Sequence, residues 1–192
     1  MSLVSFLMDA DPITQFLLWQ KDADAYDRTA AVLATCTNNI PYARTVLVKD
    51  VTADGFTFYT NANSTKGKNL FDNPKAALVF YWNERQVIGR GEVFLVDEKE
   101  ADTNFAYRPR KSRAVTTISK QSQELVSETL FLSEVEKLEN SSDPIKRPKH
   151  WVGFRLKPHT MEFFLAGEHR LNKRYLYLLQ SDGRWKISRL YP

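Results

Sequence analysis

The sequence has few of the residues that build disulfide frameworks or metal centres. Its 192 residues include one cysteine, Cys36, and three histidines. A single cysteine has no disulfide partner in its own chain, and Cys36 lies in the apolar run 30–37, so we expect a small buried core residue and a reducing, cytoplasmic environment. His150, His159 and His169 have neither a nearby cysteine nor helical spacing, which argues against a zinc site. We expect no bound metal.

Long apolar runs and glycine-rich loops are also missing. No stretch approaches the roughly 18 apolar residues of a membrane-spanning helix. The first positive charge is Lys21, so the start lacks the basic region of a secretion signal. There are only seven glycines, and neither a dinucleotide fingerprint nor a P-loop is present. These absences argue against a membrane protein, an exported protein and a nucleotide-binding parallel sheet.

The charge is mildly basic, with a formal value of +4 and a pI near 9.1. That balance fits a binder of phosphorylated small molecules as well as a binder of nucleic acid. The basic residues form short clusters rather than a long stripe, at residues 66–68, 108–113 and 146–150. By itself, the cluster at 108–113 is typical of a solvated loop. The tryptophans fit core or interface positions better than a stacking platform for bases, so we expect no nucleic-acid partner; those considered are Trp82, Trp151 and Trp185.

The segment pattern predicts a mainly β protein with peripheral helices. Strands are expected at 29–37, 42–51, 55–61, 75–82, as a pair within 85–96, and at 151–157, 160–165, 173–180 and 184–190. Helices are expected after Asp11-Pro12, over 65–72, in an acidic segment ending near Tyr107, and over 123–138, followed by a loop over 140–149. Short strands with tight turns favour an antiparallel barrel. The length and the 43% apolar content suit one core, so we expect a single domain over 1–192.

A polar segment, residues 61–68, follows the aromatic third strand; we call it the polar elbow. Ser64 is placed to cap a short helix, whose free N–H groups and positive end, together with Lys66, suit a cluster of anionic oxygens. On the preceding strand, alternation places Arg44 on one face and Lys49 on the other, so each of two anion sites could have a cation. The alternative is a capped surface helix beside a strand whose lysine ends in water. The local pattern leaves both interpretations open.

A series of short sequence pieces extends this pattern along the chain. They are RTVLVK at 44–49, GFTFYTN at 55–61, STK at 64–66, NP at 73–74, RQV at 85–87, RP at 108–109 with Ser112, SKQS at 119–122, EF at 162–163, RL at 170–171, and Arg174. In this order and spacing the chain resembles the pyridoxamine 5'-phosphate oxidase family, FMN enzymes that make pyridoxal 5'-phosphate. The resemblance implies an FMN-binding split antiparallel β-barrel and a homodimer with FMN at the subunit interface.

The resemblance also implies two sets of site residues. The cofactor-binding residues would be Arg44, Thr45, Val46, Leu47, Val48, Lys49, Tyr59, Thr60, Ser64, Thr65, Lys66, Gln86, Gln121, Ser122, Phe164 and Arg174. The residues binding a phosphorylated substrate would be Lys49, Asn104, Arg108, Ser112, Arg170 and Asn172, with Arg170 and Asn172 in the catalytic positions. Arginine and lysine suit dianionic phosphates because their hydrogen bonds to oxyanions are charge-assisted. Hydride would pass from the substrate C4' to flavin N5, with O2 reduced to hydrogen peroxide.

Several positions depart from the family pattern, mostly on the substrate side. Asn104 stands where the family has a tyrosine, Thr65 where an arginine is common, and Phe164 where a tryptophan lies near the flavin. Asn172 and Lys173 replace the histidine and aspartate of the family motif Arg-Leu-His-Asp-Arg. Two alternatives therefore stay open: an FMN oxidase of the same fold acting on another substrate, such as the phenazine-pathway relatives, and a flavin- or nucleic-acid-binding module without turnover.

Overall fold

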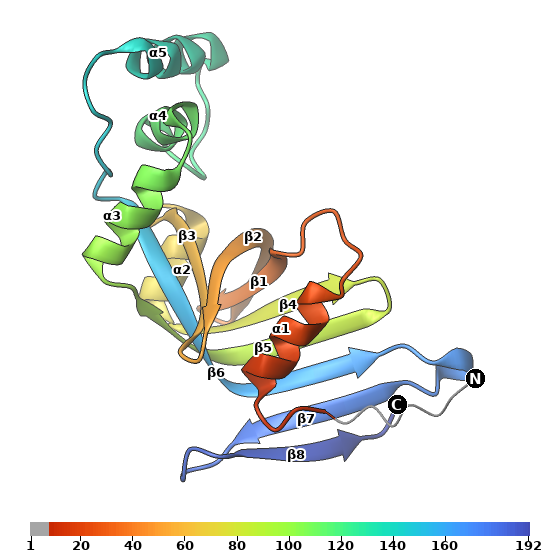
Figure 1. The fold of residues 1–192 in the computed structure, drawn as a ribbon. Helices are drawn as coiled ribbons and strands as arrows, with labels where there is room; N and C mark the ends of the chain where they lie inside the picture. Colours follow the sequence, from red (N-terminus) through yellow and green to blue (C-terminus); the bar gives the residue numbers. More distant parts are fainter. Residues whose placement is uncertain (1–7) are drawn as a thin grey trace.

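In the computed structural model, residues 8–192 are described, and within them eight strands form one antiparallel sheet. The strand order is β3-β2-β1-β4-β5-β6-β7-β8, and an additional pairing of β3 with β6 closes the first six strands into a barrel (Figure 1). The strands are β1 (Ala30–Thr37), β2 (Ile40–Thr52), β3 (Gly55–Asn61), β4 (Lys75–Trp82), β5 (Arg85–Leu95), β6 (Trp151–Leu165), β7 (Lys173–Leu179) and β8 (Trp185–Leu190). β7 and β8 continue the sheet beyond the barrel, so the predicted split antiparallel barrel is confirmed.

The helices lie at the periphery, as the sequence predicts. They are α1 (Pro12–Lys21), α2 (Thr65–Asp72), α3 (Glu98–Tyr107), α4 (Arg110–Ile118), α5 (Glu128–Asn140) and the short 3-10 helix η1 (Glu168–Arg170). Asp11 and Ser64 cap α1 and α2 as expected, because their side chains accept hydrogen bonds from backbone N–H groups of the first turn. Figure 1 shows α3, α4 and α5 together on one side of the barrel, while the β6–β7 connection lies at the far end of β6.

Four elements differ from the sequence expectation. Helix α4 covers a basic stretch for which no element was predicted, and α5 begins at Glu128 rather than at residue 123. The expected strand pair within 85–96 is the single strand β5, and the two strands expected over 151–165 are the single strand β6. The sheet accommodates Pro158 through a register shift opposite Gly91, where a Cβ atom would come within 1.9 Å of the Lys157 carbonyl oxygen. A bulge, not a strand end, therefore explains the proline.

Two apolar clusters hold these elements together. The larger one fills the barrel beneath α1, where the Phe16 ring contacts Phe56 and Phe80 at centroid distances of 4.9 and 4.7 Å. The smaller one joins α3, α4, α5 and the start of β6; its buried members are Phe105, Ala114, Val135, Ile145 and Trp151. This second cluster fixes the three helices beside β3.

Cys36 is half-buried beside a cavity on the outside of the barrel, and not in the core as its apolar neighbours suggested, because alternation along β1 turns it outward. Residues 1–7 of the opening segment, which was interpreted above as lacking a secretion signal, lie outside the described residues. Within residues 8–192 no helix is long and apolar enough to cross a membrane.

Candidate active site

The polar elbow folds into a tight turn that presents Lys66 beside the first turn of α2. The buried Ser64 hydroxyl accepts the Gly67 N–H at 3.3 Å, and a Cβ on Gly67 would lie 2.3 Å from the Ala62 carbonyl oxygen, so only glycine fits there. The Lys66 Nζ lies 3.2 Å from Thr60 Oγ1 and 3.3 Å from Ser64 Oγ, and donates to these hydroxyls. The lysine is thus folded back over the helix start instead of extending into solvent.

Arg44 adds a second cation behind Lys66. Its guanidinium donates to the Leu33 carbonyl oxygen at 3.1 Å and to Thr35 Oγ1 at 2.8 Å. Burial lowers the pKa of Arg44, and burial together with the nearby Arg44 charge lowers the pKa of Lys66. Within residues 8–192 no carboxylate forms an ion pair with either side chain. Two close, partly desolvated cations without a counter-charge are suited to an anionic ligand.

A cavity of about 170 Å³ opens in front of Lys66. It brings together members of both predicted sets, namely Thr45, Val46, Leu47, Lys49, Tyr59, Thr60, Lys66, Asn104, Arg108 and Gln121, and is completed by Trp151. The alternation predicted for β2 is confirmed, because Val46 and Val48 are buried while Thr45, Leu47 and Lys49 are exposed on the outer face. Ser112, on α4, is not among the lining residues.

Arg108 enters the cavity from the junction of α3 and α4. It is the C-cap residue of α3, and its Cζ lies 4.4 Å from the centroid of the Trp151 ring. One guanidinium nitrogen donates to Thr116 Oγ1 at 3.1 Å, whereas the buried Nε has no hydrogen-bond partner among the described residues. Burial lowers the pKa of Arg108. Because the structure bonds this guanidinium to a single hydroxyl and Arg108 lines the cavity, its other N–H donors can serve a ligand there.

The connection between α4 and α5 covers the start of α2. Gln121 Oε1 accepts hydrogen bonds from Lys66 Nζ at 3.1 Å and from Thr60 Oγ1 at 3.4 Å. The Ser122 hydroxyl accepts the Thr65 N–H at 3.3 Å, and Ser122 itself has a positive φ of 71°. These contacts join residues more than 50 positions apart, so only the resemblance pointed to them.

A second group of predicted residues lies on the neighbouring strands β5, β6 and β7. Gln86, Phe164 and Arg174 form one row across the sheet, because Phe164 is paired with Gln86 on one side and with Arg174 on the other. Arg174 donates through two nitrogens, at 2.9 and 2.7 Å, to the same oxygen of the buried Glu162 carboxylate. Glu162 was one of the short matching pieces, but no local pattern indicated that it would hold Arg174.

Arg170 and Asn172 lie in the β6–β7 turn that follows this row. His169 and Arg170 both have left-handed backbone conformations, with φ of 53° and 65°. The Asn172 Oδ1 accepts the Gly167 N–H at 3.1 Å and so closes the turn. Two consecutive non-glycine residues in this region are strained, and such strain is common at functional turns.

The two groups lie apart within one chain. Trp151 begins β6 and lines the cavity, whereas Leu165 ends β6 next to the β6–β7 turn. Fifteen residues of extended strand span on the order of 45 Å. Figure 1 shows the turn at the opposite end of the strand from α3. A single subunit therefore does not bring Arg170 to the cavity at Lys66.

Sequence comparison places these residues in a family. The profile described as pyridoxamine 5'-phosphate oxidase matches residues 21–142, and the profile of the pyridoxine 5'-phosphate oxidase C-terminal dimerisation region matches residues 151–192. The chain belongs to the pyridoxamine 5'-phosphate oxidase family. Among its curated relatives, the pyridoxine/pyridoxamine 5'-phosphate oxidase of Wolbachia pipientis wMel is 40% identical over 195 residues, which cover 97% of this chain and 90% of the relative. The enzyme of that name from Pelagibacter ubique is 41% identical over 197 residues, covering 97% and 94%.

Solved structures agree with this family membership. PhzG from Burkholderia lata 383, crystallised with tetrahydrophenazine-1-carboxylic acid, superposes with a TM-score of 0.92 at 29% identity, covering 96% of this chain and 94% of that one. A pyridoxamine 5'-phosphate oxidase-related, FMN-binding protein from Nostoc punctiforme superposes with a TM-score of 0.74 at 18% identity, covering 94% and 95%. At that identity the second likeness shows the fold alone.

Proposed function

We propose that the protein is an FMN-dependent pyridoxine/pyridoxamine 5'-phosphate oxidase that acts in the cytoplasm. The observation that carries the proposal is the cavity into which Lys49, Lys66 and Arg108 converge with no carboxylate paired to them in the described chain. Relatives about 40% identical over almost the whole chain carry this enzyme name. Bound FMN would supply the hydride acceptor and transfer the electrons to O2, yielding hydrogen peroxide.

The residues around the polar elbow fit the phosphate end of FMN. The N-terminal N–H groups of α2 and the ammonium of Lys66 supply hydrogen-bond donors and positive charge, with Arg44 behind them. Gln121 and Ser122 close the site from the α4–α5 connection. A phosphate monoester carries close to two negative charges, which this set can match with charge-assisted bonds.

The residues on the outer side of the same cavity fit a phosphorylated substrate. Lys49 points outward from β2, and Arg108 lines the same cavity with its guanidinium bonded to one hydroxyl. Asn104 lines the same cavity. These groups would fix the substrate phosphate while the oxidised carbon is held against the flavin. We propose that they increase the reaction rate through this alignment.

The second group completes the site if a partner subunit supplies it. The C-terminal region, residues 151–192, matches the family's dimerisation region. In a two-fold homodimer the far end of one β6 can meet the polar elbow of the other subunit, giving two equivalent sites. We assign the pyridine ring contact to the partner's Arg170 and the flavin contacts to the partner's Gln86, Phe164 and Arg174.

A phenazine-type oxidase is the second candidate. It is favoured by the TM-score of 0.92 with PhzG and by Asn172 and Lys173 at substrate-side positions. The exposed Lys49 beside Arg108 favours a phosphate-bearing substrate over a phenazine carboxylate, since two cations match a dianion better than a monoanion.

Peroxide release distinguishes these candidates. The purified protein is loaded with FMN and supplied with pyridoxine 5'-phosphate, pyridoxamine 5'-phosphate or a reduced phenazine carboxylic acid. We expect a yellow protein that releases peroxide with the two phosphorylated vitamins. Turnover of the phenazine alone would support the second candidate, and a protein that binds no FMN at 1 mM would refute both.

A further inference from the structure

A carboxylate–guanidinium pair lies directly behind the aromatic wall of the cavity. The Tyr59 hydroxyl donates to Glu100 Oε1 at 3.2 Å, and the same oxygen accepts from an Arg155 guanidinium nitrogen at 2.8 Å. Arg155 also donates to Thr57 Oγ1 at 2.9 Å, which fixes it to β3. The three partners of this network come from α3, β3 and β6. Tyr59 and Arg155 meet at one oxygen of Glu100.

The Tyr59 ring is confined on its other sides. It lies over Gly153, its cross-strand neighbour, where a Cβ atom would come within 2.7 Å of the ring carbon Cε1. It also stacks on Trp151 with a centroid distance of 6.3 Å and an interplanar angle of 17°. Trp151 in turn lies under Arg108 at 4.4 Å. The position of Tyr59 is therefore connected through Trp151 to a cation of the site.

A second, larger cavity explains why Tyr59 needs this network. It has a volume of about 640 Å³, and Lys49, Tyr59 and Asn104 line both it and the cavity at Lys66. Tyr59 thus separates an open space from the small anion site. Without its hydroxyl partner the ring has room to turn toward the larger cavity. That movement would remove one wall of the smaller cavity.

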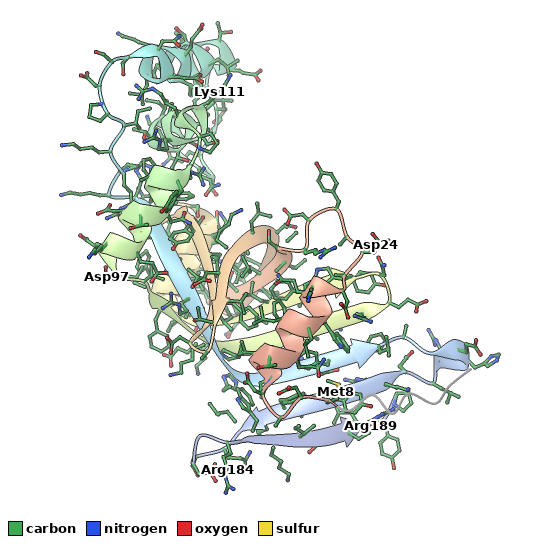
Figure 2. The ribbon with its side chains drawn as sticks, viewed as in Figure 1. Met8, Asp24, Asp97, Lys111, Arg184 and Arg189 are labelled. Atoms are coloured by element: carbon green, nitrogen blue, oxygen red, sulfur yellow. The ribbon has the colours of Figure 1, made fainter. Side chains whose placement is uncertain are left out.

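We propose that Glu100, oriented by Arg155, is a positioning residue that holds Tyr59 as the wall between the two cavities and thereby preserves the phosphate end of the cofactor site. The inference rests on the proposed function, because FMN is the ligand used to measure it. Asp97 caps the first turn of α3 by accepting the Lys99 and Glu100 N–H groups, which places Glu100 at the start of the helix (Figure 2, where Asp97 is labelled). Burial and Glu100 also raise the pKa of Tyr59 to about 12, so its phenol stays a donor well into the alkaline range.

The test measures FMN dissociation constants by flavin fluorescence for the wild-type apoprotein, four variants of Tyr59 and Glu100, and one control variant. Glu100→Ala and Tyr59→Phe should each raise the constant about 3- to 10-fold, and the double variant should be no weaker than either alone, because both changes break one interaction. Glu100→Gln keeps an acceptor for the phenol and should stay within about 2-fold of the wild type. Additive effects, or a wild-type constant in Glu100→Ala, would overturn the proposal.

Asp102→Ala is the matched control, since Asp102 also lies on α3 and also pairs with an arginine, Arg147, whereas the Tyr59 hydroxyl bonds to Glu100. It should stay within about 2-fold of the wild type. An equal loss in Asp102→Ala would assign the effect to helix docking and contradict the positioning role. If Glu100→Ala does not fold, the comparison of Glu100→Gln with Tyr59→Phe tests the positioning role instead. The proposal then requires Glu100→Gln to bind FMN normally and Tyr59→Phe to bind it weakly.

A second readout needs no flavin. The Tyr59–Trp151 stack should contribute to the near-ultraviolet circular dichroism of the apoprotein, and that contribution should persist in Glu100→Gln and fall in Glu100→Ala. A wild type that binds no FMN would refute the proposed function, and the dichroism would still decide the position of Tyr59. An unchanged dichroism signal in Glu100→Ala would refute the positioning role whatever the result with FMN.

Discussion

Lys66 is the residue on which the cofactor assignment depends most directly. It is half-buried, bonded to two hydroxyls and the Gln121 amide, and beside Arg44 without a carboxylate partner in the described chain. Lys66→Met should raise the FMN dissociation constant about 10- to 100-fold, since a charge-assisted hydrogen bond contributes about 1.5–3 kcal/mol. Flavin fluorescence titration measures the change. Lys68→Met is the control, because Lys68 is exposed on the same helix; equal losses would argue for a general charge effect.

The pH dependence of FMN binding should report the same side chain. Burial and Arg44 lower the pKa of Lys66 below the ordinary lysine value. Raising the pH removes its proton, and a neutral amine no longer attracts the phosphate, so affinity should fall with rising pH below the range in which an ordinary lysine titrates. Titrations across the alkaline range, with Lys66→Arg for comparison, measure it. The arginine variant should lack this fall, and a wild-type profile as flat as that of Lys66→Arg would contradict the prediction.

Asn172 replaces the histidine of the family motif, so it loses the proton exchange of imidazole but still closes the β6–β7 turn. Its amide cannot exchange a proton near neutral pH as imidazole does, but its Oδ1 accepts the Gly167 N–H and closes the turn that carries Arg170. We expect slow oxidation by the wild type and a rise in kcat/KM for Asn172→His. General acid–base contributions are typically about 100- to 10,000-fold; we expect less than that here, because Lys173 places a cation beside the new imidazole. Peroxide release with pyridoxine 5'-phosphate tests it, with Asn172→Ala expected to be slower than the wild type. Equal rates for all three proteins would refute both roles.

At the scale of single elements, local sequence predicted the strands and caps better than the helical arm formed by α4 and α5. Helix α4 has no side-chain cap and a basic first turn, which is unfavourable next to the positive end of a helix. Its stability comes from partners distant in the sequence, such as Arg110, whose bonds reach residues 28 to 33 positions away. Similarly, β6 continues past Pro158 because Gly91 on β5 leaves room for a bulge. Neither cause is visible in a local pattern.

We expect Arg110 to be the side chain that contributes most to holding α4 against α5. Its guanidinium donates to carbonyl oxygens at the end of α5, reaching Glu139 at 2.6 Å and Asp143 at 2.9 Å as well as Ser141. A cation here satisfies free carbonyls and complements the negative helix end. Arg110→Ala should lower the free energy of unfolding by about 2–4 kcal/mol, measured by urea denaturation. Lys111→Ala, which removes an exposed side chain labelled in Figure 2, should change it by less than about 0.5 kcal/mol. Similar losses in both variants would contradict the prediction.

At the scale of the whole molecule, the sequence predicted the members of the site without their arrangement. The spacing of short pieces identified Lys66 and Gln121, but their contact spans 55 positions and depends on how the α4–α5 connection docks. The spacing also did not show that Lys49, Lys66 and Arg108 would line one cavity. Trp151 was assigned to the core or an interface, and it is both buried and part of the cavity wall.

We propose that residues 1–192 form one domain, because β6 pairs with β3 and β5 in the barrel and with β7 beyond it.

The separation of the two residue groups along β6 leads to a prediction about subunits. If each site combines the polar elbow of one subunit with the β6–β7 turn of its partner, Arg170→Ala should inactivate both sites of a homodimer, and so should Lys66→Met at an FMN concentration that saturates the wild type but lies well below the raised dissociation constant of this variant. In a mixed dimer one site carries both changes and the other carries neither. Random pairing of equal amounts makes half of the dimers mixed, so peroxide release should recover to about 25% of the wild-type rate. The measurement uses the two variants refolded together, with each variant refolded alone as the control. If the site lay within one chain, every site would still carry one change, and no activity would return on mixing.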